Sequence, residues 1–263
     1  MKRRKRMKNT RKSIAMLMTL AMILSLESGV TMPRKARAAG YGLKNPTNTK
    51  EDGSGVTTWD CIYFGHYWQN DTNGDGIADE DDKKQPIKWR VLSVNGEDAF
   101  LLADQNLDVK PYNTYYTKKM HWETCTLRKW LNGYGESDTN EGNDNFIDNA
   151  FNDLEQDAIL DDDGTNDKIS LMSRGDVANV SYGFNETFDV KSDTRVSTAT
   201  SYTARKRNIS GACSWVLCQI SYVDRDGDTT MDVGANGMGH DCSKNVSQSN
   251  CVRPILHLNL SRS

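Results

Sequence analysis

Short apolar runs separated by turn-forming residues mark the first part of the chain, a pattern typical of β-strands. Residues 61–64, 87–92 and 99–102 form three such runs, and Asn95 and Gly96 lie between the last two. Asn-Gly is the dipeptide that most readily adopts the two positive φ angles of a type I′ turn. The pattern therefore predicts a β-hairpin centred on Asn95 and Gly96.

Two amphipathic stretches in the middle of the chain predict helices. The first covers residues 124–132, where Thr124 can cap the beginning and Gly133 can end the helix. The second covers residues 146–159. The apolar positions of both recur at helical spacing and are expected in the core. They are Leu127, Trp130 and Leu131 in the first stretch, and Phe146, Ile147, Ala150, Phe151, Leu154, Ala158 and Ile159 in the second.

The rest of the chain returns to short β segments, at residues 169–172, 214–220 and 252–260. Strands, then helices, then strands predict an α+β fold. Residues 39–57 are rich in Gly, Asn, Thr and Ser without periodicity and are expected to be a flexible lead-in. A single α+β domain with long loops, two helices and antiparallel strands is therefore expected at residues 58–263.

The N-terminal 38 residues have the features of a secretory signal peptide. Residues 2–12 are strongly basic, residues 14–26 are apolar, and Ala36, Arg37 and Ala38 provide a small-x-small cleavage pattern. The apolar run is about 13 residues long, whereas a membrane span needs about 20. We therefore expect a signal peptide at residues 1–38, a secreted or cell-surface-associated protein, and no membrane insertion after its removal.

Charge narrows the classes of partner. The formal net charge is −3, but the first 38 residues hold 11 basic side chains and one acidic one, which leaves a net charge of −13 on the remainder. Such a surface repels nucleic acid and anionic membranes and attracts cations. We therefore expect no nucleic-acid partner.

Six cysteines follow the expected signal peptide, and an even number in an exported chain is typical of a disulfide framework. Fifteen pairings exist, and the sequence does not choose among them. Zinc binding is the competing interpretation, but there is no Cys-x-x-Cys pair and no familiar arrangement of the four histidines. The cysteines are Cys61, Cys125, Cys213, Cys218, Cys242 and Cys251.

Residues 71–82 (DTNGDGIADEDD) carry the most specific chemical motif. A 12-residue calcium loop needs oxygen ligands at positions 1, 3, 5, 9 and 12, a glycine at position 6 and a backbone carbonyl at position 7. The alternative is a merely acidic, solvated turn. The loop resembles those of dockerin modules, although a β pattern follows it and the second loop of a dockerin is missing. The expected Ca²⁺ ligands are Asp71, Asn73, Asp75, Ile77 (backbone), Asp79 and Asp82.

A second acidic cluster matches the same pattern less well. Asp224, Asp226, Asp228 and Asp232 would occupy positions 1, 3, 5 and 9, but position 6 is Thr229 and position 12 is an alanine. Because glycine at position 6 allows the sharp turn around the ion, we interpret this cluster as an ordinary turn.

The chain as a whole resembles a family of secreted bacterial proteins known as domain of unknown function 6273. The resemblance covers about residues 58–260 and rests on the runs WDCIYFGHYWQ, PIKWRVLSVNGEDAFLLADQ, WETCTLRKWLNGYG, FIDNAFNDLEQDAI and CVRPILHLNL. Members usually carry a Trp-Trp-Leu-Arg-Ser-Pro-Gly motif before the last strands. Only Trp215 and Leu217 of that motif are present here.

The final third also resembles the C-type-lectin-like fold shared by sugar-binding modules and formylglycine-generating enzymes. That resemblance implies a scaffold presenting variable loops, and it implies a bridge between Cys125 and Cys251. The spacing of Cys213 and Cys218 is similar to that of the copper-binding cysteines of those enzymes.

The function expected from the sequence is that of a secreted, calcium-stabilised binding module for a carbohydrate or a cell-surface protein. It is not expected to be an enzyme, and no catalytic residue is assigned. The alternatives are a thiol-dependent metalloenzyme and a structural protein of the cell envelope.

Overall fold

A computed structural model describes residues 42–135, 144–161, 165–223 and 227–262 of the chain. The expected signal peptide at residues 1–38, and Asp224 and Asp226 of the second acidic cluster, lie outside these residues. In the described part, helices and many antiparallel strands combine in an α+β fold, as the sequence predicts.

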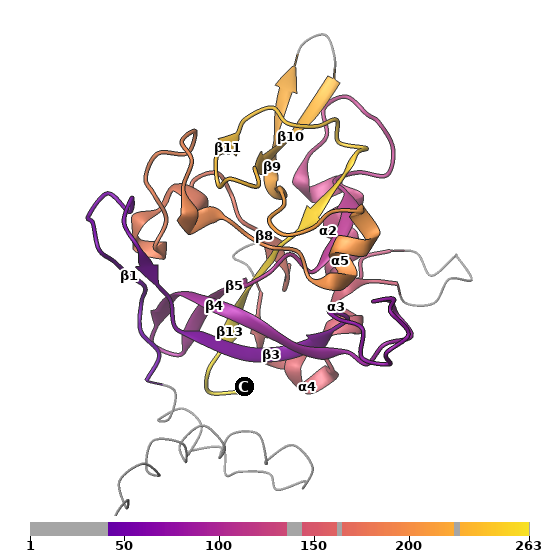
Figure 1. Ribbon diagram of the computed structural model, residues 1–263, viewed down its shortest axis with the longest axis horizontal. Coiled ribbons are helices and arrows are strands. Elements are labelled where there is room, and N and C mark those ends of the chain that lie inside the picture. The colour runs from indigo at the N-terminus through magenta and orange to yellow at the C-terminus, as the bar shows by residue number, and fades with distance from the viewer. Residues whose placement is uncertain (1–41, 136–143, 162–164, 224–226, 263) are drawn as a thin grey trace, which may run out of the picture.

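The larger sheet has six strands in the order β3-β4-β5-β13-β7, and β8 also pairs with β13. Every pairing in it is antiparallel. The sheet crosses the lower part of Figure 1. Its strands are β3 (Cys61–Tyr67), β4 (Gln85–Asn95), β5 (Asp98–Ala103), β7 (Ile159–Leu160), β8 (Ser170–Leu171) and β13 (Pro254–Asn259).

The second sheet has five strands in the order β11-β10-β9-β12-β6. Strands β9 and β10 form a long hairpin that projects away from the larger sheet (Figure 1). β12 pairs with β9 in parallel, with Cys251 opposite Trp215. The strands are β6 (Asp108–Pro111), β9 (Trp215–Val223), β10 (Gly227–Val233), β11 (Gly239–His240) and β12 (Ser249–Val252).

Arg253 divides the β segment expected at residues 252–260 between the two sheets. Its side chain is fully buried, and its Nε donates to the carbonyl oxygen of Ala103 at 2.8 Å. The guanidinium also lies 4.9 Å from the centre of the Trp215 ring. β12 and β13 therefore follow each other in sequence but belong to different sheets.

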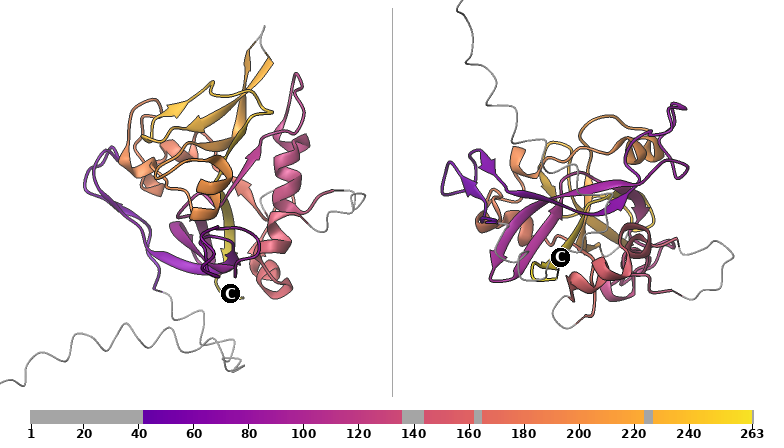
Figure 2. Two further views of the ribbon diagram at one scale, coloured as in Figure 1. Left: turned by 45° about the vertical axis from the view of Figure 1, so that its right-hand side comes forward. Right: turned by 90° about the horizontal axis from the view of Figure 1, so that it is seen from below.

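In the described residues, four short α-helices lie beside the sheets, and the segment from α2 to α4 follows one side of the molecule (Figure 2). Four 3-10 turns accompany them. The α-helices are α2 (Thr126–Asn132), α3 (Phe146–Ala150), α4 (Asp153–Ala158) and α5 (Ser201–Arg207). The 3-10 turns are η1 (Trp122–Thr124), η2 (Asp176–Ala178), η3 (Val180–Tyr182) and η4 (Asp193–Arg195).

The first expected helix is present, but its cap differs. α2 begins at Thr126, and the residue that caps it is Cys125, whose Sγ accepts a hydrogen bond from the Arg128 amide at 3.3 Å. Thr124 instead lies in the preceding 3-10 turn. Gly133 ends the helix with a φ of 70°, as predicted.

The second expected helix is broken into α3 and α4. Phe151 is extended, with φ −136° and ψ 136°, because Asn152 begins a new helix in which its side chain and Glu155 form a reciprocal capping box. The break rotates Leu154 outward, and its side chain is 80% exposed. The prediction that Leu154 belongs to the core is therefore wrong.

The hairpin at residues 95–96 is confirmed, with a different turn. Asn95 pairs with Asp98, so the loop residues are Gly96 and Glu97. Gly96 has a φ of 63°, and Asn95 and Glu97 are not among the residues with positive φ. A positive φ at the first loop position alone is the pattern of a type II′ turn, not the expected type I′.

The segment expected to be a flexible lead-in contains regular structure. β1 (Thr47–Asn48) and β2 (Thr57–Thr58) form a small antiparallel sheet. The Thr57 hydroxyl donates to the carbonyl oxygen of Gly183 at 2.6 Å. A Cβ atom on Gly53 would lie 2.0 Å from the carbonyl oxygen of Phe184, so this approach requires glycine.

The core consists of two clusters of apolar side chains. Trp89 and Trp215 are both fully buried, the first in the cluster around the larger sheet and the second in the cluster beneath the β9–β10 hairpin. Leu217 lies fully buried beside Trp215. The two residues shared with the motif of the related proteins therefore contribute to packing.

Candidate functional site

The acidic loop, residues 71–82, connects β3 and β4, as the sequence predicts. Its side chains fix its own backbone: the Asn73 Oδ1 accepts from the Asp75 amide at 2.9 Å, and the Asp75 Oδ1 accepts from the Ile77 amide at 2.8 Å. The Asp79 Oδ1 accepts in the same way from the Asp81 amide at 3.0 Å. Such turns bend the chain after each alternate residue, which is what a calcium loop requires of it.

Two glycines complete the sharp part of this loop. Gly74 and Gly76 have φ angles of 81° and 86°, which other residues rarely adopt. The carboxylate of Asp71 accepts from both of their amides, at 2.6 Å from Gly74 and 2.7 Å from Gly76. The backbone at position 6 of the motif thus turns as the sequence predicts.

Asp82, at position 12, is the buried carboxylate of the loop, with 6% of its surface exposed. Its Oδ1 accepts from the amides of Thr72 and Asn73 at 2.6 and 3.1 Å, and its Oδ2 accepts from the amide of Asp79 at 2.9 Å. The bonds from the Thr72 and Asp79 amides lower the pKa of this carboxyl below its usual value. Asp82 therefore joins the two ends of the loop and is ionised at neutral pH.

The donors of the acidic loop suit calcium in chemical type, because carboxylate and amide oxygens are the ligands of a hard cation. They do not converge as they stand: no group of three or more His, Cys, Asp or Glu side chains in the described part of the chain is placed to hold a metal ion. Binding requires these carboxylates to gather around the ion. The residues that would hold it are Asp71, Asn73, Asp75, Ile77 through its carbonyl oxygen, Asp79 and Asp82.

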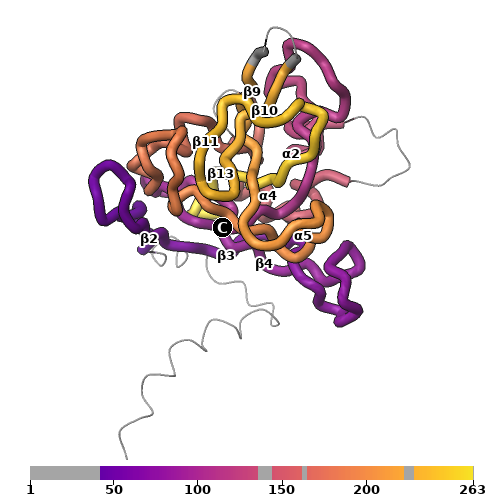
Figure 3. Tube along the Cα trace, turned by 45° about the horizontal axis from the view of Figure 1, so that its top comes forward, coloured from indigo at the N-terminus to yellow at the C-terminus, as the bar shows by residue number. Residues whose placement is uncertain are grey.

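The acidic loop lies against α5, whose last turn is basic (Figure 3). The Arg205 Nε donates to the carbonyl oxygen of Ala78 at 2.8 Å. The Tyr202 hydroxyl donates to the Glu80 carboxylate at 2.6 Å, and the Trp68 Nε1 donates to the Glu80 carbonyl oxygen at 3.1 Å. A change in the conformation of the loop would therefore reach α5.

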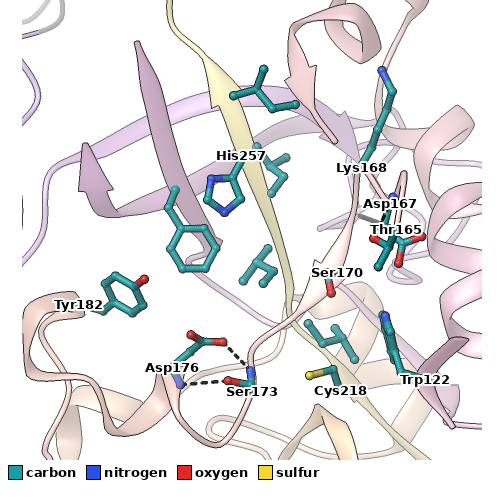
Figure 4. A pocket seen from close by; sticks show the side chains of 15 residues that line it. Trp122, Thr165, Asp167, Lys168, Ser170, Ser173, Asp176, Tyr182, Cys218 and His257 are labelled. Atoms are coloured by element: carbon teal, nitrogen blue, oxygen red, sulfur yellow. Dashed lines mark hydrogen bonds between the residues drawn. The ribbon is translucent and has the colours of Figure 1, made fainter. Parts of the chain in front are cut away.

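A cavity of about 300 Å³ lies elsewhere, between β13, β8 and the turns that follow β8. Figure 4 shows His257 in its middle, with Tyr182 and Asp176 on one side and Trp122 and Lys168 on the other. The residues that line it are Phe100, Trp122, Leu160, Thr165, Asp167, Lys168, Ser170, Leu171, Ser173, Asp176, Tyr182, Cys218, Ile255, Leu256 and His257. We call it the β13 pocket.

The β13 pocket combines aromatic walls with fixed polar groups. The ring of His257 stacks on Phe100 with 4.5 Å between centroids, and its Nδ1 lies 3.0 Å from the Asp98 carboxylate. Asp167 is 1% exposed and pairs with Arg128 at 2.7 Å, and its Oδ1 has no hydrogen-bond partner in the described part of the chain. Apolar walls with a few fixed polar groups are typical of sites for small molecules.

The described residues of the second acidic cluster face the protein. Asp228 is 4% exposed and accepts a hydrogen bond from the Met120 amide. Asp232 is 1% exposed and lies 2.8 Å from the Nδ1 of His240. Both carboxylates belong to β10 and have partners within the protein, so the described part of this cluster is a strand and not the expected turn.

The structure places the cysteines differently from the expected pairing. No disulfide bond joins any two of the six cysteines, all of which lie in the described part of the chain. The Sγ of Cys251 lies 3.0 Å from that of Cys213, whereas Cys125 belongs to the other apolar cluster and caps α2. The pairing of Cys125 with Cys251 is thus corrected. Cys218 packs against the cluster that contains Cys125, whereas Cys213 belongs to the other cluster, so the structure does not bring together the two cysteines whose spacing resembles a copper-binding pair.

The model of the family described as domain of unknown function 6273 matches residues 95–260. The chain belongs to this family. No curated protein and no solved structure matches the chain. Every residue of the β13 pocket lies within the matched segment, and the acidic loop lies before it. The pocket therefore belongs to the family domain, and the loop precedes it.

Sequence reasoning missed the β13 pocket because its walls come from distant segments. Phe100, Asp167 and His257 show no common spacing, and only the fold brings them together. The one available signal was the run ending the chain, in which a histidine stands among apolar strand residues.

Proposed function

We propose that this protein is a secreted binding module for a carbohydrate, and that one calcium ion stabilises its acidic loop. The observation that carries the calcium proposal is the loop itself. Oxygen donors occupy the required positions, and the two glycines and the side-chain turns give the backbone its bends. The net charge of −13 on the chain without its first 38 residues also favours the binding of a cation.

Calcium would act on stability through two contacts. An ion that neutralises the carboxylates of the loop would order residues 71–82, and the Arg205 and Tyr202 contacts would carry that order to α5. In this proposal the ion has no part in a reaction. The recognition surface in this proposal is the β13 pocket, because it combines aromatic and polar walls and lies within the segment that the family model matches.

Thermal unfolding with and without EDTA tests the calcium proposal. Calcium at about 100 times its dissociation constant would raise the midpoint by about 5–10 °C, and EDTA would remove that gain. Asp75→Ala should abolish the response, because it removes a proposed ligand. Asp75 is exposed, and its carboxylate accepts from the Ile77 amide of the same loop. Asp81→Ala is the matched control, since it removes the same charge from a position that supplies no ligand.

An identical melt with and without EDTA, together with no calcium uptake in equilibrium dialysis, would contradict the calcium proposal. So would an equal loss of response in Asp75→Ala and Asp81→Ala. The two variants differ only in which carboxylate is removed from one loop. A general effect of charge would change both.

Carbohydrate binding in the β13 pocket is tested separately. A panel of mono- and oligosaccharides titrated into the protein should show saturable binding that Tyr182→Ala weakens about tenfold or more, because a sugar ring stacks on an aromatic wall. Tyr115→Ala is the control, since Tyr115 is 75% exposed and lies outside the pocket. Absence of binding to every sugar, combined with tight association to cell wall, would favour the structural envelope protein instead.

A further inference from the structure

Cys213 and Cys251 lie side by side and have no part in the proposed function. Cys213 lies just before β9 and Cys251 lies in β12, and these neighbouring strands run parallel at this point. The two sulfur atoms are 3.0 Å apart, with 5% and 0% of the respective residues exposed. A disulfide bond is about 2.05 Å long, so a shift of about one ångström would bring the sulfurs within bonding distance.

Polar groups surround these thiols. The Asn106 Nδ2 donates to the Sγ of Cys213 at 2.8 Å. Asn106 is fully buried, and its backbone carbonyl oxygen accepts from the amide of Thr200 at 3.2 Å, so the residue is held in place. On the other side the Nη1 of Arg207 lies 3.6 Å from the Sγ of Cys251. Both sulfurs therefore have donors directed at them.

Hydrogen bonds to its sulfur favour the thiolate of Cys213. Hydrogen bonds from Cys251 and Asn106, together with the charges of Arg207 and Arg253, lower the pKa of the Cys213 thiol, although burial opposes them. The hydrogen bond to Cys213 and burial raise the pKa of Cys251, which retains the shared proton. These directions favour Cys213 as the attacking thiolate and Cys251 as the resolving thiol.

We propose that Cys213 and Cys251 are a modification site and form an intramolecular disulfide in the mature protein. The occurrence of the bond in the cell rests on the proposed export, because disulfides persist in oxidising compartments. The geometry of the pair is independent of export.

The reaction needs a disulfide of low molecular weight, or that of an exported oxidoreductase, as the oxidant. The Cys213 thiolate attacks one sulfur of this disulfide, which forms a mixed disulfide and releases the first thiolate. Cys251 then gives up its proton and attacks the Sγ of Cys213, which releases the second thiolate. Two protein thiols become one disulfide, and the oxidant is reduced to two thiols.

The bond would tie the connection between α5 and β9 to β12 across 38 residues of sequence. Closing a loop of this length removes entropy from the unfolded chain and typically raises the unfolding midpoint by on the order of 10 °C in a protein of this size. The bond would also hold β9 and β12 together at the point where their pairing is a single residue pair.

Disulfide mapping on the purified full chain tests the proposal without reference to export. Protein treated with glutathione disulfide is unfolded in guanidinium with iodoacetamide and no reductant, and then digested. Trypsin leaves Cys213 and Cys218 in one peptide, so a second digestion after Trp215 separates them. We expect a cross-linked peptide that joins Cys213 to Cys251. Carbamidomethylation of both residues, or a link from either one to another cysteine, would overturn the proposal.

Variants test the effect on stability. The oxidised parent should melt about 10 °C above the reduced parent, and Cys213→Ser and Cys251→Ser should each show no such difference. Cys242→Ser is the matched control, because Cys242 is exposed, and it should keep the full difference. An equal difference in Cys251→Ser and the parent would overturn the proposal. If a serine variant does not fold, the mapping of the parent alone decides.

The same experiments separate this proposal from the proposed function. If the cell does not export the protein but purified protein forms the bond in glutathione disulfide, only the proposed secretion is contradicted. If both thiols are still alkylated by iodoacetamide after treatment with glutathione disulfide, only the proposed bond is contradicted. The EDTA melt and the sugar titration would be unaffected.

Discussion

The acidic loop and the segment of residues 177–190 both lack strands and α-helices, yet their backbones are fixed in opposite ways. In the acidic loop, side chains of the loop accept hydrogen bonds from amides two to ten positions away. In residues 177–190, carbonyl oxygens converge on one distant side chain, the fully buried guanidinium of Arg195. That side chain donates to the carbonyl oxygens of Val177, Asn185, Thr187, Phe188, Val190 and Gly237.

The difference concerns where the cation comes from. Arg195 is a cation built into the chain, and it satisfies carbonyl oxygens much as a bound ion would. The acidic loop offers oxygens of its own, and in our proposal its cation comes from solution. The Arg195 side chain reaches these carbonyl oxygens only after the protein has folded. In the acidic loop, the spacing of residues in the sequence is enough to place the oxygen donors. Only the second kind can respond to a chelator.

Replacing Arg195 should have the largest effect. Arg195→Met removes a donor from six carbonyl oxygens, of which, among the described residues, only that of Phe188 has a second donor, the Gly239 amide at 2.8 Å, so we expect a loss of about 3–5 kcal/mol of unfolding free energy. Arg205→Met is the control. Its side chain is 50% exposed and donates to one carbonyl oxygen, so its loss should be about 1 kcal/mol or less. Urea denaturation measures both, and equal losses would remove the distinction between the two regions.

Acid should weaken the acidic loop through Asp82. Its folded pKa lies below the unfolded value of about 4, so its contribution is present above that value and is lost as the pH falls through the folded pKa. Asp82→Asn should therefore flatten the fall in stability between about pH 5 and pH 2 and abolish the EDTA response at neutral pH. Asp81→Asn should keep both, since the Asp81 carboxylate supplies no ligand. Parallel acid profiles for parent and Asp82→Asn would contradict this.

The same division explains what the sequence could predict. The acidic loop, the hairpin at Gly96 and the end of α2 at Gly133 depend on neighbouring residues, and their positions were predictable. The proximity of Cys213 and Cys251 and the walls of the β13 pocket depend on strand order, which no local pattern contains. Cys125 shows that residue type alone does not determine a role, because a thiol expected in a disulfide bridge caps a helix instead.

The break between α3 and α4 gives the smallest effects and the sharpest test of local control. Asn152→Ala removes the capping box and should cost about 1 kcal/mol, because the amide of Glu155 loses its acceptor. Leu154→Glu, two residues further along, should change the unfolding free energy by less than about 0.5 kcal/mol, since Leu154 is 80% exposed. Urea denaturation of the two variants compares them directly. A larger loss for Leu154→Glu than for Asn152→Ala would mean that the apolar stripe, and not the cap, determines where these helices end.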